Sequence, residues 1–253
     1  MAGWLFLLAC GLGASFVSSL VGIGGAVLII PIILIAQKYA GLNLGMHQIT
    51  GLTTLFVFVA GTIGFWNHGR HYKIEKKLVV ITGTGASVGA LAGGVAQFYM
   101  PHTVILVTFI ALLFLIATLM LWPIKSEREE MPDYSLIKTS IGCVTGGFLA
   151  GMVGIGGGTI LVPFMIVFLG IPTRKAFTTG LALVMLAGFF GLVGRLSQAH
   201  LIPWLSGIPL LAGIYPGSGL GTLVNRRSPA GILRKVFAVI ILVLAVQQVI
   251  KII

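Results

Sequence analysis

The sequence predicts an all-α polytopic membrane protein made of two inverted repeats, each a glycine-broken helical hairpin plus three transmembrane helices. The first observation is composition: the 253 residues are 57% hydrophobic and 8% charged, whereas a soluble domain carries roughly 25% charged residues. The second is a set of uncharged runs such as 2–37 and 139–170, since about 18 apolar residues cross a bilayer. The third is an internal repeat. We therefore expect a multi-pass protein of the cell (plasma or inner) membrane.

The apolar segments follow an order that divides the chain near its middle. They cover 2–37, 48–66, 78–100, 103–122, 136–170, 176–198, 201–224 and 230–252. The connection "PIKSEREEMPDYSLIK" carries four of the five acidic residues. We expect a first membrane repeat at 1–122, a charged cytoplasmic linker at 123–138 and a second membrane repeat at 139–253.

Three landmarks recur in the same order in both halves. They are "LVGIGGAVLIIP" and "MVGIGGGTILVP" at an offset of 132, "ITGLT" and "TTGLA" at 129, and two ladders with glycine at every fourth position, 85–93 and 213–221, at 128. Chance does not produce three such matches in one order, so we infer an internal duplication.

Basic loops predict the orientation, because Lys and Arg gather on the cytoplasmic side of a membrane. Loops 67–77 and 225–235 each carry four such residues. Both are cytoplasmic only if 136–170 crosses the membrane an even number of times, as a hairpin that turns at the glycines or as two short crossings. If 2–37 also makes an even number of crossings, the two halves have inverted orientations in the membrane. We then expect the two glycine turns to face each other near the midplane. Inverted repeats with broken helices are typical of transporters.

The repeated glycine phrase is the strongest candidate site. Glycine permits a break in a helix, and the amides that begin the next half-helix form an anion site at its positive end. Pro31 and Pro163 follow the breaks and each remove one backbone donor. The alternative is that these glycines only let helices pack closely, which is the interpretation we favour for the ladders. The glycines that we assign to substrate binding are Gly22, Gly24, Gly25, Gly154, Gly156, Gly157 and Gly158.

Polar residues inside the apolar segments are further candidates for substrate binding. Threonine hydroxyls could bind an oxyanion or bond to helix carbonyls, which is their commoner use. An ionisable side chain inside the membrane is a functional candidate, although one near a helix end can reach the interface. The candidates are Thr50, Thr53, Thr54, Thr178, Thr179, Asn67, His68 and Arg195.

Several function classes are excluded or unsupported. All five acidic residues lie between 75 and 133, so the spans hold no set of nucleophile, base and acid, and we expect no enzyme. Cys10 and Cys143 show no metal-ligand spacing, and we expect no cofactor and no metal. The basic residues lie in short connections, so the net charge of +11 indicates topology and not nucleic-acid binding.

At these residues the chain resembles the sulfite exporter TauE/SafE family, also called the sulfonate uptake permease family. The resemblance rests on "SSLVGIGGAVLIIPIIL", "AGMVGIGGGTILVPFMI", the threonines after each, and "NHG" at 67–69, and it covers nearly the whole chain. It implies export or uptake of a small sulfur-containing anion such as sulfite or a sulfonate. The two hairpins are not fully equivalent, since the second copy has three fewer residues before its threonines.

We therefore expect a secondary transporter that moves a small anion across the membrane by alternating access, with the anion and the lipid bilayer as partners. A passive anion channel and a non-transporting membrane assembly subunit are the alternatives. The identity of the anion, the direction, the coupling ion and homodimer formation stay open.

Overall fold

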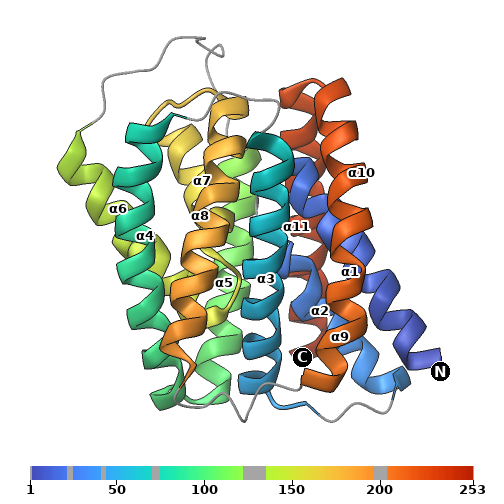
Figure 1. Cartoon of the computed structure of the whole chain (residues 1–253). Helices are drawn as coiled ribbons and strands as arrows, with labels where there is room; N and C mark the ends of the chain where they lie inside the picture. Colours follow the sequence, from blue (N-terminus) through green and yellow to red (C-terminus); the bar gives the residue numbers. More distant parts are fainter. Residues whose placement is uncertain are drawn as a thin grey trace.

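The computed structural model describes residues 2–21, 25–40, 44–69, 75–121, 135–196 and 204–252, and every regular element in this part of the chain is a helix (Figure 1). In order, the elements are α1 (Ala2–Val21), α2 (Ala26–Ala40), α3 (Met46–Gly69), α4 (Lys76–Ala96), the 3-10 turn η1 (Gln97–Tyr99), α5 (His102–Leu121), α6 (Leu136–Val153), α7 (Gly157–Val167), α8 (Thr173–Gly194), α9 (Trp204–Ala212), α10 (Ile214–Arg227) and α11 (Ala230–Ile252).

Eight helical segments among the described residues are long and apolar enough to cross a membrane. They are α1, α3, α4, α5, α6, α8, α11 and the segment Gly207–Arg227, which covers the end of α9 and all of α10. Large apolar side chains such as Val80, Ile137 and Ile141 are exposed on the outside of the bundle, where lipid would cover them. The prediction of an all-α polytopic membrane protein is confirmed.

Both glycine phrases break the chain where the sequence predicts. α6 ends at Val153, Gly154 and Gly156 both have φ of +80°, and α7 begins at Gly157. In the first half α1 ends before the phrase, Gly25 has φ of +58°, and α2 begins directly after it. Glycine is required at these positions because a side chain makes a left-handed backbone costly.

The two arms of each hairpin differ in length. α1 has 20 residues and α6 has 18, whereas α2 has 15 and α7 has 11. At 1.5 Å per residue α6 extends about 27 Å and α7 about 16 Å. Each hairpin therefore combines one arm long enough to cross the membrane, α1 or α6, with one short arm.

Two predicted boundaries differ from the structure. The segment 201–224 divides into α9 and α10 at Gly213, because Pro216 in the first turn of α10 cannot continue a helix from α9. α6 begins at Leu136, so the last three residues of the predicted linker 123–138 are helical. Residues 123–134 of that linker lie outside the described residues.

The glycine ladders pack helices together, as we predicted. On α4 the ladder lies against backbone carbonyls of α6, and on α10 the corresponding ladder lies against backbone carbonyls of α1. The α4–α6 contacts recur between α10 and α1. Each glycine of α10 lies 128 positions after its counterpart in α4, and each carbonyl of α6 lies 132 positions after its counterpart in α1. The repeated pairs are Gly85–Ser140 with Gly213–Leu8, Gly89–Val144 with Gly217–Leu12, and Gly93–Phe148 with Gly221–Phe16.

α3 and α8 are antiparallel neighbours inside the bundle (Figure 1). A Cβ atom on Gly61 would lie 2.6 Å from the amide nitrogen of Met185, and one on Gly64 would lie 3.0 Å from a methyl of Leu181. Since residue numbers rise along α3 as they fall along α8, the carboxyl ends of these two helices lie at opposite ends of the molecule.

One end of the molecule is marked by basic residues, and we call it the basic end. Lys175 Nζ lies 3.9 Å from Glu75 Oε1, and Arg174 Nη2 donates a hydrogen bond of 3.2 Å to the carbonyl of Ser228. The starts of α4 and α8 and the turn between α10 and α11 therefore share this end. It is uppermost in Figure 1. The starts of α3 and α5 meet at the opposite end, where the Met46 amide donates to His102 Nε2 at 3.2 Å.

Candidate substrate site

The opposite end of the molecule holds a buried cation. Arg195 directly follows α8 and is 2% exposed. Its Nη2 donates to the carbonyl of Gly151 at 2.6 Å and to that of Met152 at 3.5 Å, and its Nη1 donates to Gly191 at 3.2 Å. Gly151 and Met152 end α6, where the helix dipole favours a positive charge. Within the described residues no carboxylate pairs with this guanidinium, so its charge is not neutralised there.

Gln97 connects this guanidinium to α3. Its Oε1 accepts a hydrogen bond of 2.8 Å from Arg195 Nε, and its Nε2 donates to the hydroxyl of Thr50. The Thr50 hydroxyl donates in turn to the carbonyls of Met46 and His47, at 2.9 and 3.0 Å. Gln97 is completely buried and lies at the end of α4, where the 3-10 turn directs the chain back over the bundle. A continuous polar path thus runs from α8 through α4 to α3.

The second glycine turn lies against the threonines of α3. A Cβ atom on Gly154 would lie 2.7 Å from the carbonyl of Thr50, 3.0 Å from Thr54 Oγ1 and 3.1 Å from Thr53 Oγ1. Hydroxyls, a guanidinium and the positive end of α7 therefore gather around one turn, and these are the groups that bind oxyanions. We call Arg195, Gln97, Thr50, Thr53, Thr54 and the turn 154–157 the arginine cluster.

The hydroxyls of the arginine cluster also have the structural role that we weighed. Thr53 and Thr54 both donate to the carbonyl of Thr50, at 3.0 and 2.7 Å. Each hydroxyl oxygen keeps lone pairs but uses its proton inside the helix. An anion would need these protons to turn toward it, so Arg195 and the backbone amides are the stronger donors here.

A second buried polar cluster lies at the basic end. His68, near the end of α3, is 1% exposed, and its Nε2 lies 2.9 Å from the carbonyl of Ser19. Asn225 Nδ2 donates to the carbonyl of Leu20 at 2.6 Å, and the hydroxyls of Ser19 and Ser218 lie 2.6 Å apart. Asn67 Nδ2 reaches Ser218 Oγ at 3.4 Å. We call these six residues the histidine cluster.

The two clusters are built on corresponding positions of the repeat. Ser19 and Leu20 precede Gly151 and Met152 by 132 residues, and Gln97 precedes Asn225 by 128, the offsets at which the landmarks match. In both halves the last carbonyls of the first helix accept hydrogen bonds from the end of the third helix. The donor is Arg195 in one half and His68 in the other.

The structure brings together some of the sequence-predicted candidates and separates others. Thr50, Thr53, Thr54, Gly154 and Arg195 meet in the arginine cluster, and the buried glycines Gly156, Gly157 and Gly158 continue that turn. Asn67 and His68 meet in the histidine cluster. Thr178 and Thr179 are buried in the first turns of α8, at the basic end, and the Thr178 hydroxyl donates to the carbonyl of Arg174 at 3.1 Å. Gly25 lies against Ala14 and Ser18 of α1, while Gly22 and Gly24 lie outside the described residues.

The second glycine turn leads from one end of the bundle to its middle. α6 ends beside Thr50, but Gly156 lies against Val57 in the middle of α3, and the short helix α7 begins there. α7 occupies the upper half of the bundle and α2 the lower half (Figure 1). Residues 22–24 of the first turn lie outside the described residues, so the expectation that both turns face each other near the midplane stays a prediction. The ends of α1 and α6, at His68 and Thr50, are 18 positions apart in α3, or about 27 Å along the helix.

Sequence reasoning missed Gln97, Ser19, Ser218 and Asn225. A signal was present, because Gln97 and Asn225 match at the offset of 128 that also relates the glycine ladders. Only their contacts identify them, because Asn225 donates to the end of α1 and Gln97 bonds Arg195 and Thr50.

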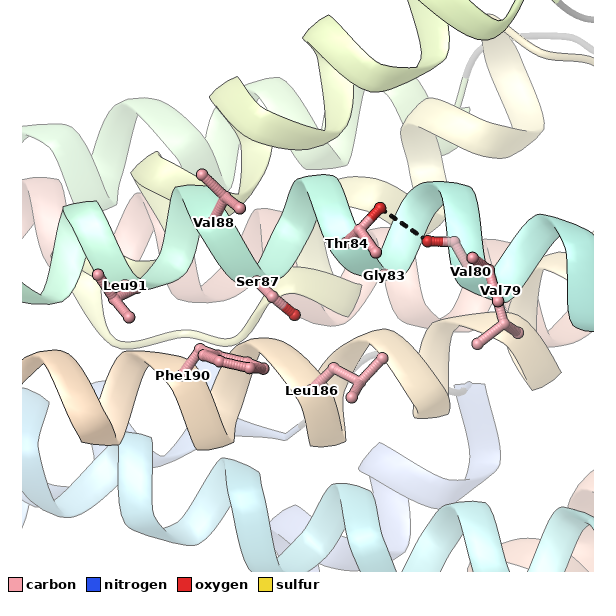
Figure 2. A pocket seen from close by; sticks show the side chains of 9 residues that line it. All are labelled: Val79, Val80, Gly83, Thr84, Ser87, Val88, Leu91, Leu186 and Phe190. Carbon is pink, nitrogen blue, oxygen red and sulfur yellow. Dashed lines mark hydrogen bonds between the residues drawn. The ribbon is translucent and has the colours of Figure 1, made fainter.

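The described residues also contain an apolar cavity of about 470 Å³ between α4 and α8. Figure 2 shows Thr84 bonded to the carbonyl of Val80, at 2.8 Å, and the Ser87 hydroxyl among apolar side chains. A cavity with so few free donors suits an apolar group and not an anion. Its lining is Val79, Val80, Gly83, Thr84, Ser87, Val88, Leu91, Leu186 and Phe190.

Cys143 is buried against Gly85 and Cys10 is half-buried, both as free thiols. Among the described residues no group of three or more His, Cys, Asp or Glu side chains could hold a metal ion.

Apolar helices of spanning length, broken helical hairpins and ionisable groups buried inside the bundle define a multi-pass membrane protein with the architecture of transporters. The chain belongs to the sulfite exporter TauE/SafE family, whose model matches residues 7–247. The resemblance carried by the glycine phrases is thereby confirmed, and the family is one of membrane transporters.

Relatives of similar length support this assignment. The probable membrane transporter protein YunE of Bacillus subtilis is 22% identical over 96% of both chains. A probable membrane transporter protein of Xylella fastidiosa (strain Temecula1) is 28% identical over 91% of this chain and 89% of its own. One of Haemophilus influenzae is 29% identical over 77% of this chain and 73% of its own. No solved structure shows significant similarity to the chain.

Proposed function

We propose that this protein is a secondary transporter that moves a small anion, such as sulfite or a sulfonate, across the cell membrane by alternating access. The observation that carries the proposal is the burial of Arg195 among uncharged partners beside the second glycine turn. It would act as a carrier and not as an enzyme.

A buried guanidinium favours an anionic ligand for a physical reason. Removing a charge from water costs several kcal/mol even after the protein relaxes. Carbonyls of Gly151, Met152 and Gly191 recover part of this cost, but they leave the net charge in place. A bound anion would neutralise it, and a guanidinium matches the planar edge of an oxyanion.

Alternating access is supported by the position of the two clusters. The arginine cluster lies at one end of α3 and the histidine cluster at the other, and the helices that carry them run in opposite directions. We infer that the two halves are inverted repeats, each of which supplies the polar group at one mouth of the path. The basic end would face the cytoplasm, because its loops carry the excess of Lys and Arg.

The choice of a sulfur-containing anion comes from the family. Nothing in the arginine cluster distinguishes sulfite from another oxyanion of similar size, since a guanidinium and backbone amides bind any of them. The family description names sulfite, and sulfonates share its pyramidal oxygen face.

The experiment is an anion screen with the purified protein and two variants. We expect sulfite or methanesulfonate to raise the melting temperature and to exchange across proteoliposome membranes. Arg195→Gln should fold but lose the anion-dependent shift and at least 90% of exchange, because it removes the charge. Arg195→Lys should keep part of both, since it keeps the charge without the fork of donors.

Three results would overturn the proposal. If no anion in the panel stabilises the protein or is exchanged, an assembly subunit is favoured. If the flux shows neither saturation nor counterflow, a passive channel is favoured. If the Arg195→Gln variant is fully active, the anion binds elsewhere.

A further inference from the structure

We propose that the apolar cavity between α4 and α8 is a groove that binds one acyl chain of an anionic phospholipid from the cytoplasmic leaflet, with the lipid phosphate at Lys76 and Lys77. This lipid site is separate from the arginine cluster, and it does not rest on the anion transport proposed above.

The groove exists because α4 and α8 approach each other closely at one end and less closely at the other. Both helices begin at the basic end. Near their carboxyl ends, a Cβ atom on Gly94 would lie 2.7 Å from the carbonyl oxygen of Gly191. Nearer the basic end, the atom closest to a Cβ on Gly83 would be a methyl of Leu186, which belongs to a side chain and not to the backbone. The two backbones therefore separate toward the basic end.

The groove is apolar and open to the outside of the bundle. Its volume is about 470 Å³. Val80 and Val88 on its rim are 61% and 64% exposed, whereas the buried Ser87 points from α4 toward Leu186 and Phe190 of α8 (Figure 2). In a membrane this opening faces the hydrocarbon core, so a lipid chain is the apolar group that reaches it.

The length of the groove fits one leaflet of the bilayer. Its lining residues Val79 and Leu91 are 12 positions apart on α4, or about 18 Å, and half of the hydrocarbon core is about 15 Å thick. A membrane-spanning helix of a second copy would cross the whole core and is about 10–12 Å wide with its side chains. Since packed helices lie only about 8–10 Å apart, the space between α4 and α8 suits a single acyl chain better than a helix.

Two lysines extend the groove toward the membrane surface. Lys76 and Lys77 are exposed in the first turn of α4. Side chains three or four positions apart lie next to each other on a helix, so Lys76 is in line with Val79 and Val80, and Lys77 is in line with Val80. A phospholipid whose chain lies in the groove would therefore place its phosphate beside these two ammonium groups.

The charges at this mouth of the groove favour an anionic headgroup. Arg174 and Lys175 begin α8 at the same end, and Lys175 Nζ lies 3.9 Å from Glu75 Oε1. Among the described residues at the starts of α4 and α8, four side chains are basic and one is acidic. Lys and Arg side chains attract the anionic lipids of the cytoplasmic leaflet, whereas a zwitterionic headgroup brings no net charge to balance them.

The test uses the full-length protein in detergent, with phosphatidylglycerol as the anionic probe and phosphatidylcholine with the same acyl chains as the neutral probe. Native mass spectrometry gives the number of bound lipids and an apparent Kd. For the wild type we expect one phosphatidylglycerol, bound about tenfold more tightly than phosphatidylcholine. A phosphatidylglycerol with a photoactivatable group on one acyl chain should label peptides of α4 and α8.

The contact with the headgroup is tested by removing the two lysine charges. In the double variant Lys76→Gln and Lys77→Gln, the affinity for phosphatidylglycerol should fall about tenfold, to that for phosphatidylcholine. The matched control is Arg226→Gln with Arg227→Gln, which removes two exposed charges of α10 at the same end. It should bind phosphatidylglycerol like the wild type, because these arginines lie away from the groove.

The contact with the acyl chain is tested by filling the groove. Thr84→Phe places a ring in it and should abolish the photolabelling of α4 and α8. Thr145→Phe on α6 is the matched control, since both threonines are exposed and donate to the carbonyl four positions earlier, at 2.8 and 2.9 Å. This control should be labelled like the wild type.

Several results would overturn the proposal. They are equal wild-type affinity for the two lipids, an equal loss of affinity in the lysine and arginine variants, and wild-type labelling outside α4 and α8. A dimer that Thr84→Phe dissociates would assign the groove to a second copy. If Thr84→Phe does not fold, the labelled peptides of the wild type decide. These measurements follow lipid and not anion transport, so their failure would leave the carrier standing.

Discussion

In the arginine cluster one residue, Arg195, carries the charge and another, Gln97, positions it. Gln97 accepts from Arg195 and donates to Thr50, so its side chain positions the guanidinium without changing the net charge. Gln97→Glu would place a carboxylate where Oε1 now lies, 2.8 Å from Arg195 Nε. We expect this variant to fold and to raise the Kd for the anion at least tenfold, because the charge that attracts the anion is then neutralised.

The converse change separates this effect from a loss of structure. Gln97→Leu removes the acceptor for Arg195 Nε and should lower stability by about 1–3 kcal/mol, while the charge still attracts the anion. Thermal unfolding and anion titration of both variants measure the two properties. Equal anion affinity in Gln97→Glu and the wild type would show that the charge of Arg195 does not bind the substrate.

At the scale of helices, glycine ladders determine how closely the first arm of each hairpin approaches its neighbour. Gly89 and Gly217 correspond in the repeat, and each lies against a backbone carbonyl, of Val144 and of Leu12. Alanine at either position would force two backbones apart, and we expect losses of about 1–3 kcal/mol, as for overpacking in a core.

Gly219 supplies the control on the same helix as Gly217. A Cβ atom there would meet nothing within 4 Å, so Gly219→Ala should be neutral or stabilise α10 by up to about 1 kcal/mol. Unfolding of the detergent-solubilised variants measures all three. If Gly89→Ala and Gly217→Ala unfold like Gly219→Ala, the ladders do not control helix packing.

At the scale of the whole molecule, the two ends should face opposite sides of the membrane. In a background with Cys10→Ala and Cys143→Ala, we expect Ser228→Cys to react with an impermeant maleimide only from the cytoplasmic side. Thr103→Cys, near the start of α5, should react only from outside. Labelling of both from one side would contradict the topology.

The residues that match between the halves show how far sequence reasoning reaches. The helix breaks, the glycine ladders and Arg195 could be predicted because each leaves a local signal: a cluster of glycines, a period of four, or a charge in an apolar run. Gln97 and Asn225 match only at the repeat offset of 128 and leave no local signal. Their role depends on the groups that they meet across the bundle, which are Arg195 and Thr50 for Gln97 and the carbonyl of Leu20 for Asn225.

The amino-acid sequence by itself determined the membrane class, the duplication and the places where helices break, because composition, repeats and glycine act locally along the chain. Only the tertiary structure decided that the ends of α1 and α6 lie about 27 Å apart along α3, at His68 and at Thr50. The lengths of α1 and α6, and the antiparallel packing of α3 on α8, place them there. These distances depend on how helices from both halves pack, which no local pattern records.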